Sequence, residues 1–165
     1  LQHIGLSGHS YGANTTQALM GQRYRARGGF EDSRIDAFLP MSPSAGKLFS
    51  PEESFGHITA PVLLMTGTHD GNPIDPTMTP ESRRLVYTAL PEGAAFQLVL
   101  DHAHHSAFSN TPRPEVEHHH PAILVISSKF WDAYLREDEA AESWLRSDQA
   151  REDAGLVEAD VWEWK

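Results

Sequence analysis

The sequence predicts an α/β fold with a mostly parallel sheet, and two observations carry this prediction. Short apolar runs alternate with longer stretches in which apolar residues recur at helical spacing. Residues 61–66 (PVLLMT) are almost entirely apolar and are bounded by Pro61 and Gly67, which is typical of a strand buried on both faces of a parallel sheet. Strands and helices that alternate along the chain favour a parallel sheet with crossover helices.

Each predicted element follows from its own pattern. Residues 2–6 (QHIGL) have the composition of a strand end, and Pro40 marks the end of a second strand. Pro80 lies at the first turn of a helix, where its missing N–H is tolerated. The sequence predicts strands over 2–6, 34–41, 61–66 and 95–100, helices over 11–22, 80–90, 121–136 and 138–149, a loop-rich segment over 42–59 and a surface loop over 109–121. The tail beyond Gly155 has no clear pattern.

The composition of the chain disfavours or excludes several classes of function. The 165 residues suffice for one domain, here 1–165, with a formal net charge of −10. That acidity disfavours nucleic acid as a partner. No apolar run reaches the ~20 residues of a membrane span. The chain has no cysteine, which excludes disulfides, thiolate metal sites and a cysteine nucleophile. The sequence leaves the compartment open.

The pentapeptide Gly8-His9-Ser10-Tyr11-Gly12 lies between a predicted strand and a predicted helix. This G-x-S-x-G arrangement is a nucleophile elbow, in which a strained turn projects the serine hydroxyl above the sheet. We expect the two glycines to leave room where strand and helix approach, and the Tyr11 N–H to serve as an oxyanion donor. The alternatives are a turn with an ordinary serine and a phosphate-binding loop, whose glycine patterns are absent.

A serine nucleophile needs a base and an acid, which follow the serine in the order acid, then histidine. Asp70 comes directly after the buried run 61–66, although Asp70-Gly71 is also a good turn pair. Asp75 is a weaker candidate on the same loop, and Asp36 is predicted at the opposite end of the sheet. The base is expected after strand 95–100, where His102, His104 and His105 all qualify.

A metal site is the main alternative for the histidines. His102, His104, His105 and the run 118–120 could be ligands, but they lack the H-E-x-x-H spacing and a neighbouring carboxylate pattern. We expect no metal and no cofactor, and we interpret the run 118–120 as solvated loop histidines.

Four stretches together, LSGHSYGA, APVLLMTGTHD, LVLDHAHHSAFS and SSKFWDAYL, resemble bacterial α/β-hydrolases. The most similar group is the predicted dienelactone hydrolases, with chlorophyllase-like and platelet-activating-factor acetylhydrolase-like esterases. The resemblance implies the α/β-hydrolase fold, Ser10 as nucleophile and Asp70 as acid. The family pattern L-D-G-A-x-H-x-x-F places the base on His105, and the chain departs from it at His102, where the family often has glycine, and at His104.

The resemblance also implies that strands precede this segment. In that family the nucleophile follows the fifth of eight strands, whereas here it follows the first predicted strand. The segment is therefore expected to be the part of one domain from the nucleophile strand to the C-terminal helices. The second oxyanion donor is expected upstream, which predicts poor activity for the segment alone.

The predicted function is hydrolysis of a small-molecule carboxylic ester by a Ser-His-Asp triad through an acyl-enzyme. A thioesterase or peptidase would use the same triad, and a non-catalytic binding module would use none of it. Substrate specificity is expected to depend on the loops 42–59 and 71–80.

Overall fold

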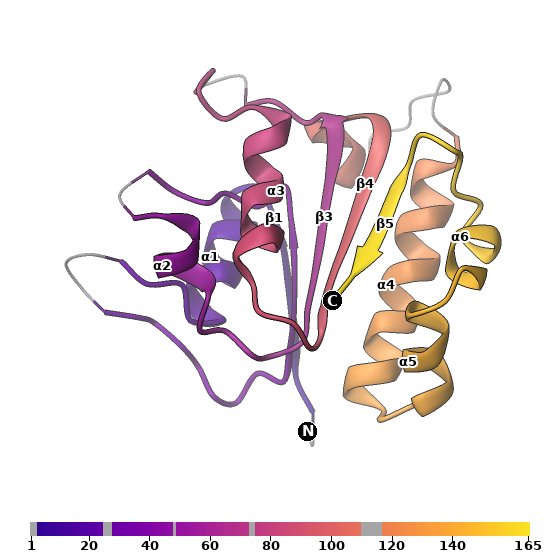
Figure 1. Ribbon diagram of the computed structural model, residues 1–165, viewed down its shortest axis with the longest axis horizontal. Coiled ribbons are helices and arrows are strands. Elements are labelled where there is room, and N and C mark those ends of the chain that lie inside the picture. Colours follow the sequence, from indigo (N-terminus) through magenta and orange to yellow (C-terminus); the bar gives the residue numbers. More distant parts are fainter. Residues whose placement is uncertain (1–2, 25–27, 48, 73–74, 110–116) are drawn as a thin grey trace.

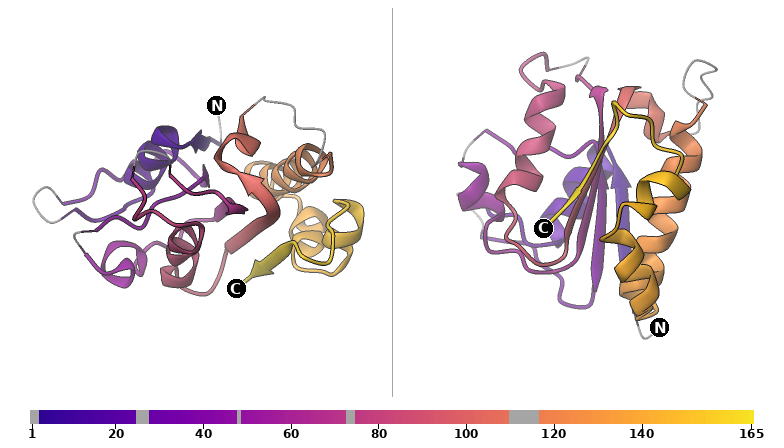
Figure 2. Two further views of the ribbon diagram at one scale, coloured as in Figure 1. Left: turned by 90° about the horizontal axis from the view of Figure 1, so that it is seen from above. Right: turned by 45° about the vertical axis from the view of Figure 1, so that its right-hand side comes forward.

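The computed structural model describes residues 3–24, 28–47, 49–72, 75–109 and 117–165. A five-stranded sheet in the order β1-β2-β3-β4-β5 carries helices on both faces (Figures 1 and 2). β1 to β4 run parallel and β5 runs antiparallel to β4, which confirms the mostly parallel α/β architecture. The strands are β1 Gly5–His9, β2 Ala37–Met41, β3 Val62–His69, β4 Ala95–His104 and β5 Val161–Trp164.

The helices form the two outer layers (Figure 2). One layer contains α1 to α3 and the other α4 to α6, with bounds α1 Tyr11–Leu19, α2 Pro51–Phe55, α3 Pro80–Ala89, α4 His119–Leu135, α5 Glu139–Leu145 and α6 Gln149–Asp153. The central strand β3 shows why both layers are needed. Val62 and Leu64 pack with the α3 side, whereas Leu63 and Met65 pack with the α4 side, and all four are fully buried. The near-continuous apolar run of β3 is therefore confirmed as a strand covered on both faces.

Three strands run further toward the site than their apolar residues indicate, and one of them, β3, ends at His69 rather than at residue 66. β1 ends at His9 rather than at residue 6, because Ser7 and His9 still pair with Leu39 and Met41 of β2. β4 continues beyond residue 100 to His104. Backbone pairing does not require apolar side chains. The hydropathy pattern therefore does not show how far these strands extend at their polar carboxyl ends.

The helices differ from prediction mainly at their ends. α1 ends at Leu19, before the predicted residue 22, and the loop-rich segment 42–59 contains the short α2. The helix predicted over 138–149 is two helices, α5 and α6. The side chain of Asp138 accepts hydrogen bonds from the N–H groups of Ala140 and Ala141 and so begins α5.

The segment 109–121 is only partly a loop. Residues 110–116 lie outside the described residues, and residues 119–121 belong to α4. The interpretation of the run 118–120 as solvated loop histidines is wrong, because His119 and His120 belong to α4 and only His120 of the three is exposed. His119 is buried and donates from Nε2 to the carbonyl of Asp101 at 2.8 Å, while Nε2 of His118 lies 3.1 Å from Oδ2 of Asp160.

The unassigned C-terminal tail forms β5 at the edge of the sheet beside β4. Trp162 is buried and stacks on Phe96, with 5.9 Å between ring centroids. The alternation of Trp162, Glu163 and Trp164 is the signal that could have predicted this strand.

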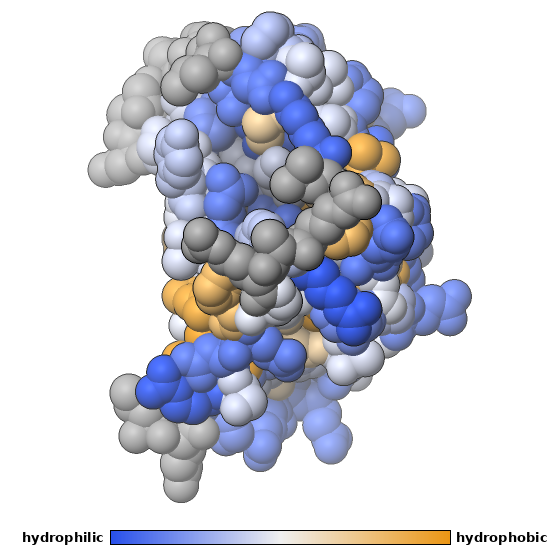
Figure 3. Space-filling view, turned by 90° about the vertical axis from the view of Figure 1, so that its left-hand side faces the viewer, coloured by the Kyte–Doolittle hydropathy of each residue, from blue (hydrophilic) through white to orange (hydrophobic). Residues whose placement is uncertain are grey.

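The surface is polar on the face seen in Figure 3, where hydrophilic residues predominate and hydrophobic ones occur in separate groups. Within the described ranges, none of the helices combines the length and the apolar character needed to cross a bilayer.

Candidate active site

Ser10 lies on a sharp turn between β1 and α1, as the G-x-S-x-G pattern predicts. Its backbone has φ 59° and ψ −112°, a conformation that L-residues rarely adopt. The Ser10 N–H donates to the carbonyl of Met41 at 3.1 Å, and the Ser10 carbonyl accepts from the N–H of Asn14 at 3.2 Å. These bonds hold the strained turn to β2 on one side and to α1 on the other.

Only one of the two motif glycines is required for close packing. A Cβ on Gly8 would lie 2.3 Å from the backbone C and O of Gly12, so a side chain there would collide with the helix. A Cβ on Gly12 would meet no atom within 4 Å, so the expectation that Gly12 relieves a clash is wrong. The backbone of Gly12 lies close to Gly8, because the strand turns directly into the helix.

Asp70 follows β3 and is fully buried. Its Oδ2 accepts a hydrogen bond from the hydroxyl of Thr66 at 2.9 Å. The Asp70 N–H donates to the carbonyl of Gly67 at 3.1 Å, which fixes the turn that carries the carboxylate. The other two candidate acids have other partners. Asp36 accepts from the N–H of Ile4 at the opposite end of the sheet, and Asp75 pairs with Lys47 at 2.6 Å.

His105 joins Ser10 to Asp70. Its Nε2 lies 2.9 Å from Oγ of Ser10, and its Nδ1 lies 2.7 Å from Oδ1 of Asp70. Because a carboxylate can only accept, the short contact assigns the ring proton to Nδ1 and leaves Nε2 free to accept from the serine hydroxyl. The three residues come from three parallel strand ends, those of β1, β3 and β4.

Within the described part of the chain, His102 and His104 form no hydrogen bond or ion pair with Ser10 or Asp70. His102 lies 3.3 Å from Asp101, and the rings of His102 and His104 lie 4.9 and 5.0 Å from that of His69. Both still belong to β4, where residues two apart share a face. His105 begins a 3₁₀ turn, His105–Phe108, which carries its ring in a different direction.

Arg83 is a buried residue beside Asp70 that the sequence patterns did not predict. It projects from α3, is only 2% exposed, and donates from Nε to the Asp70 carbonyl at 2.5 Å, with Oδ1 of Asp70 at 3.1 Å. Its Nη1 donates to the carbonyls of Ser42 and Pro43 at 2.8 and 3.1 Å. Burial lowers the pKa of the guanidinium, and the charge of Asp70 opposes that effect.

Arg83 also approaches His105. Nη2 of Arg83 lies 3.4 Å from Nδ1 of His105. The 2.7 Å bond to Asp70 occupies the Nδ1 proton, so the longer contact brings two donors together and is not a hydrogen bond in this tautomer. The burial of Arg83 could have been predicted, because its spacing places it on the same helical face as three residues that are buried, Val86, Tyr87 and Leu90.

His9, the second residue of the motif, packs against the ring of His105 with 4.7 Å between centroids and a tilt of 41°. Phe108 lies 6.1 Å from the His9 ring. Burial, and next the charge of His105, lower the pKa of His9. A hydrogen bond with the His105 backbone and the charge of Asp70 oppose this shift, and the charge of Arg83 adds to it. Nε2 of His9 is buried and unpartnered within the described chain. A neutral imidazole thus flanks His105 without adding positive charge.

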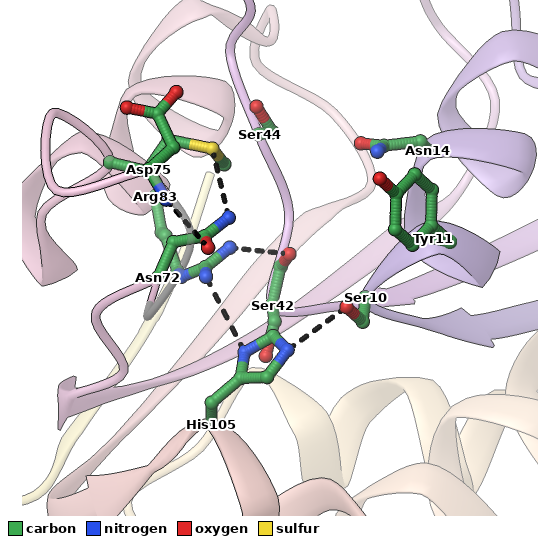
Figure 4. Close-up of a pocket in the computed structure, with 10 residues that line it drawn as sticks. Ser10, Tyr11, Asn14, Ser42, Ser44, Asn72, Asp75, Arg83 and His105 are labelled. Carbon is green, nitrogen blue, oxygen red and sulfur yellow. Dashed lines mark hydrogen bonds between the residues drawn. The ribbon is translucent and has the colours of Figure 1, made fainter.

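A cavity of about 400 Å³ opens beside Ser10 and His105 (Figure 4). Its lining includes residues of both loops expected to set specificity, and it comprises Ser10, Tyr11, Asn14, Ser42, Ser44, Asn72, Asp75, Met78, Arg83 and His105. Tyr11 is 82% exposed at the start of α1. Across the described ranges, no group of three or more histidine or acidic side chains is arranged to hold a metal ion.

Comparison with known proteins adds no assignment. The chain matches no family model, and it matches no curated protein.

Proposed function

We propose that this protein is a serine hydrolase that cleaves carboxylic esters, with Ser10 as nucleophile, His105 as general base and Asp70 as the residue that orients His105. The observation that carries the proposal is the continuous hydrogen-bonded chain from Oγ of Ser10 through both nitrogens of His105 to Oδ1 of Asp70, at 2.9 and 2.7 Å. This arrangement has the connectivity of a nucleophile, a base and an orienting acid.

The α/β-hydrolase fold is part of the same proposal. Three features support it: the strained serine between β1 and α1, the chain order serine, aspartate, histidine, and the placement of all three at the carboxyl ends of parallel strands. Because unrelated folds can support one chemistry, the proposed reaction rests on the site and not on the fold.

The geometry suggests how acylation proceeds. Oγ of Ser10 attacks the ester carbonyl carbon while its proton passes to Nε2 of His105, and the carbonyl electron pair moves onto the oxygen. The Tyr11 N–H, at the start of α1, is the proposed donor to that oxyanion. Collapse of the tetrahedral intermediate expels the alcohol, which takes the proton from Nε2 and leaves the acyl group on Ser10.

Water then reverses these steps. His105 takes a proton from the water as the oxygen attacks the acyl carbon, and collapse returns that proton to Oγ of Ser10 and releases the carboxylic acid. In both half-reactions His105 is transiently cationic beside the buried Asp70. Arg83 stays fixed by the carbonyls of Asp70, Ser42 and Pro43, so the carboxylate keeps its orientation through the charge change.

Trapping of the acyl-enzyme tests this function. After incubation with p-nitrophenyl acetate at mildly acidic pH, the intact protein should gain the mass of one acetyl group on Ser10. Ser10→Ala should gain none, while Ser7→Ala, an exposed position on the same strand, should behave like the unaltered chain. Acetylation of Ser10→Ala to the same extent would contradict the proposal.

A further inference from the structure

β4 has an irregular segment directly before the turn that carries the proposed base. Gly67 of β3 pairs with Leu100, and His69 pairs with His104, so two steps along β3 match four steps along β4. The extra length is a β-bulge, which we define as residues 101–103. Bulges bend a strand and re-aim side chains, and they are frequent beside active sites. The direction of the proposed base therefore depends on how this bulge is held.

The bulge is strained and closely packed. His102 has φ 54°, in the left-handed region that favours glycine. Ala103 is fully buried, and a Cβ on Gly67 would lie 2.2 Å from its carbonyl oxygen. β3 and β4 thus approach so closely that only a glycine fits opposite Ala103. A strained backbone persists only where surrounding contacts hold it.

Side chains from β3 and α4 hold the backbone of the bulge. The hydroxyl of Thr68 accepts from the His102 N–H at 2.8 Å and donates to Oδ1 of Asp101 at 3.1 Å. The buried His119 donates from Nε2 to the Asp101 carbonyl at 2.8 Å. The strained residues are therefore tied to the two elements that flank them.

A third contact comes from Asp160, in the segment directly before β5. Figure 1 shows that β5 begins at the end of the sheet where β4 ends. The carboxylate of Asp160 is fully buried, and its Oδ1 accepts from the Asp101 N–H at 2.7 Å. Its Oδ2 accepts from the Val157 N–H at 2.9 Å and lies 3.1 Å from Nε2 of His118. A buried carboxylate, which the proposed chemistry does not use, thus joins the C-terminal segment to the bulge.

The bulge matters because the proposed base must meet two fixed groups at once. Ser10 is fixed by β2 and α1, and Asp70 by the turn after β3. His105 must place Nε2 2.9 Å from Oγ of Ser10 and Nδ1 2.7 Å from Oδ1 of Asp70. A displacement of about 1 Å in such an arrangement can lower a rate by ~10²-fold. A contact that holds the bulge can therefore act on the rate without touching the substrate.

We infer that Asp160 is a positioning residue for His105, because its buried carboxylate holds the Asp101 N–H and with it the bulge that directs the imidazole. In the described chain its side chain bonds to the bulge and not to the imidazole, so its effect reaches His105 through the backbone. The inference rests on the proposed esterase function. It deepens that function by assigning a role in it to a residue 59 positions after Asp101.

The rate of acylation tests this role. In the p-nitrophenol burst from p-nitrophenyl acetate, Asp160→Asn should lower the acylation rate constant at saturation by about 10-fold. Asparagine keeps the size of the side chain but has one acceptor oxygen, so it leaves the N–H of Asp101 or of Val157 without its partner. Asp160→Ala removes both acceptors and should lower the rate constant further, by up to ~10²-fold. The half-saturating concentration should stay within twofold, because in the described chain the bulge does not line the cavity beside Ser10.

Glu163→Gln is the matched control. Glu163 is also an acidic residue of the C-terminal segment, and its carboxylate accepts from the side chain of Gln97 in β4 at 2.5 Å. That contact lies in the regular part of β4, where the two residues pair in register. Glu163→Gln should therefore be acylated at a rate within twofold of that of the unaltered chain.

The imidazole proton of His105 gives a readout that a merely structural role would not change. In protein with isotope-labelled histidine, the proton on Nδ1 is identified by its absence in His105→Gln. Its bond to Asp70 is short and charge-assisted, which places its resonance far downfield. Both Asp160 variants should move this resonance upfield or broaden it, and Glu163→Gln should not. All readings are taken below the Tm of each variant, so unfolding contributes to none of them.

Thr68→Val tests the bulge without altering the buried carboxylate. Valine keeps the β-branched shape at this exposed position of β3 and removes the hydroxyl that pairs with His102 and Asp101. It should lower the acylation rate constant by roughly 3- to 10-fold and move the His105 resonance in the same direction. This variant decides the question if the Asp160 variants do not fold.

The outcomes separate the two claims. An unchanged acylation rate or an unchanged His105 resonance in the folded variants, or an equal loss of rate in Glu163→Gln, overturns the positioning role and leaves the esterase proposal standing. Absence of any acylation of Ser10 in the unaltered chain overturns the esterase proposal and the inference that rests on it.

Discussion

The guanidinium of Arg83 binds Asp70 twice, through the backbone carbonyl at 2.5 Å and beside the carboxylate at 3.1 Å, and both side chains are buried. Removing one partner of a buried pair leaves an uncompensated charge. Arg83→Met should therefore lower the free energy of unfolding by about 3–5 kcal/mol, measured by urea denaturation.

Arg84→Met is the matched control for that loss. Arg84 is the next residue of α3, and its partner Glu163 lies 3.1 Å away with both side chains partly exposed. An exposed pair contributes about 0–1 kcal/mol. Equal losses in the two variants would show that Arg83 does not stabilise the buried carboxylate.

The orienting role of Asp70 predicts a large kinetic effect. Asp70→Asn keeps the size of the side chain but lets His105 adopt the wrong tautomer, which should lower kcat by ~10⁴-fold. Asp36→Asn, at the far end of the sheet, should retain the rate of the unaltered chain. Similar rates of steady-state ester hydrolysis in the two variants would contradict this role of Asp70.

The two motif glycines should respond differently to alanine. Gly8→Ala places a Cβ 2.3 Å from backbone atoms of Gly12 and should destabilise the fold by roughly 1–3 kcal/mol or more. Gly12→Ala meets no atom and replaces a poor helix former, so it should be neutral or stabilising by up to about 1 kcal/mol. Thermal unfolding of both variants checks this, and a loss in Gly12→Ala as large as that in Gly8→Ala would contradict it.

The pKa of His9 predicts how stability varies with pH. Because the folded state lowers this pKa below its usual value, the unfolded chain binds the proton first as the pH falls. Stability from neutral His9 is thus present above pH 6.5 and is lost as the pH falls through the folded pKa. His119, whose pKa burial also lowers, contributes with the same sign.

His9→Phe removes this titration while keeping an aromatic ring beside His105. Urea denaturation at several pH values between 7.5 and 5 should give a shallower loss of stability in the variant, by at most about 1.4 kcal/mol per pH unit for one proton. Parallel curves for the two proteins would rule out a depressed His9 pKa.

Much of this architecture could be predicted because its signals are local. The apolar run of β3 and the glycine-bounded Ser10 carry their structure in a few adjacent residues. Asp70 could be proposed because it directly follows that run. The order of these elements then places the strand ends together at one edge of the sheet.

The remaining features depend on contacts that adjacent residues do not encode. The choice among His102, His104 and His105 depends on where β4 ends, and backbone pairing carries it four residues beyond its apolar run. Arg83 lies 13 residues from Asp70, and its burial is visible only once α3 packs on the sheet. β5 was missed because a short edge strand depends on its partner, β4.

The central claim is that His105, and not its neighbours, activates Ser10, and the rate of labelling by a fluorophosphonate probe tests it most directly. Peptide mapping should place the adduct on Ser10. His105→Gln should slow labelling by about 10²-fold or more, whereas His104→Gln should stay within twofold. An adduct on another serine, or equal slowing by the two variants, would contradict the account.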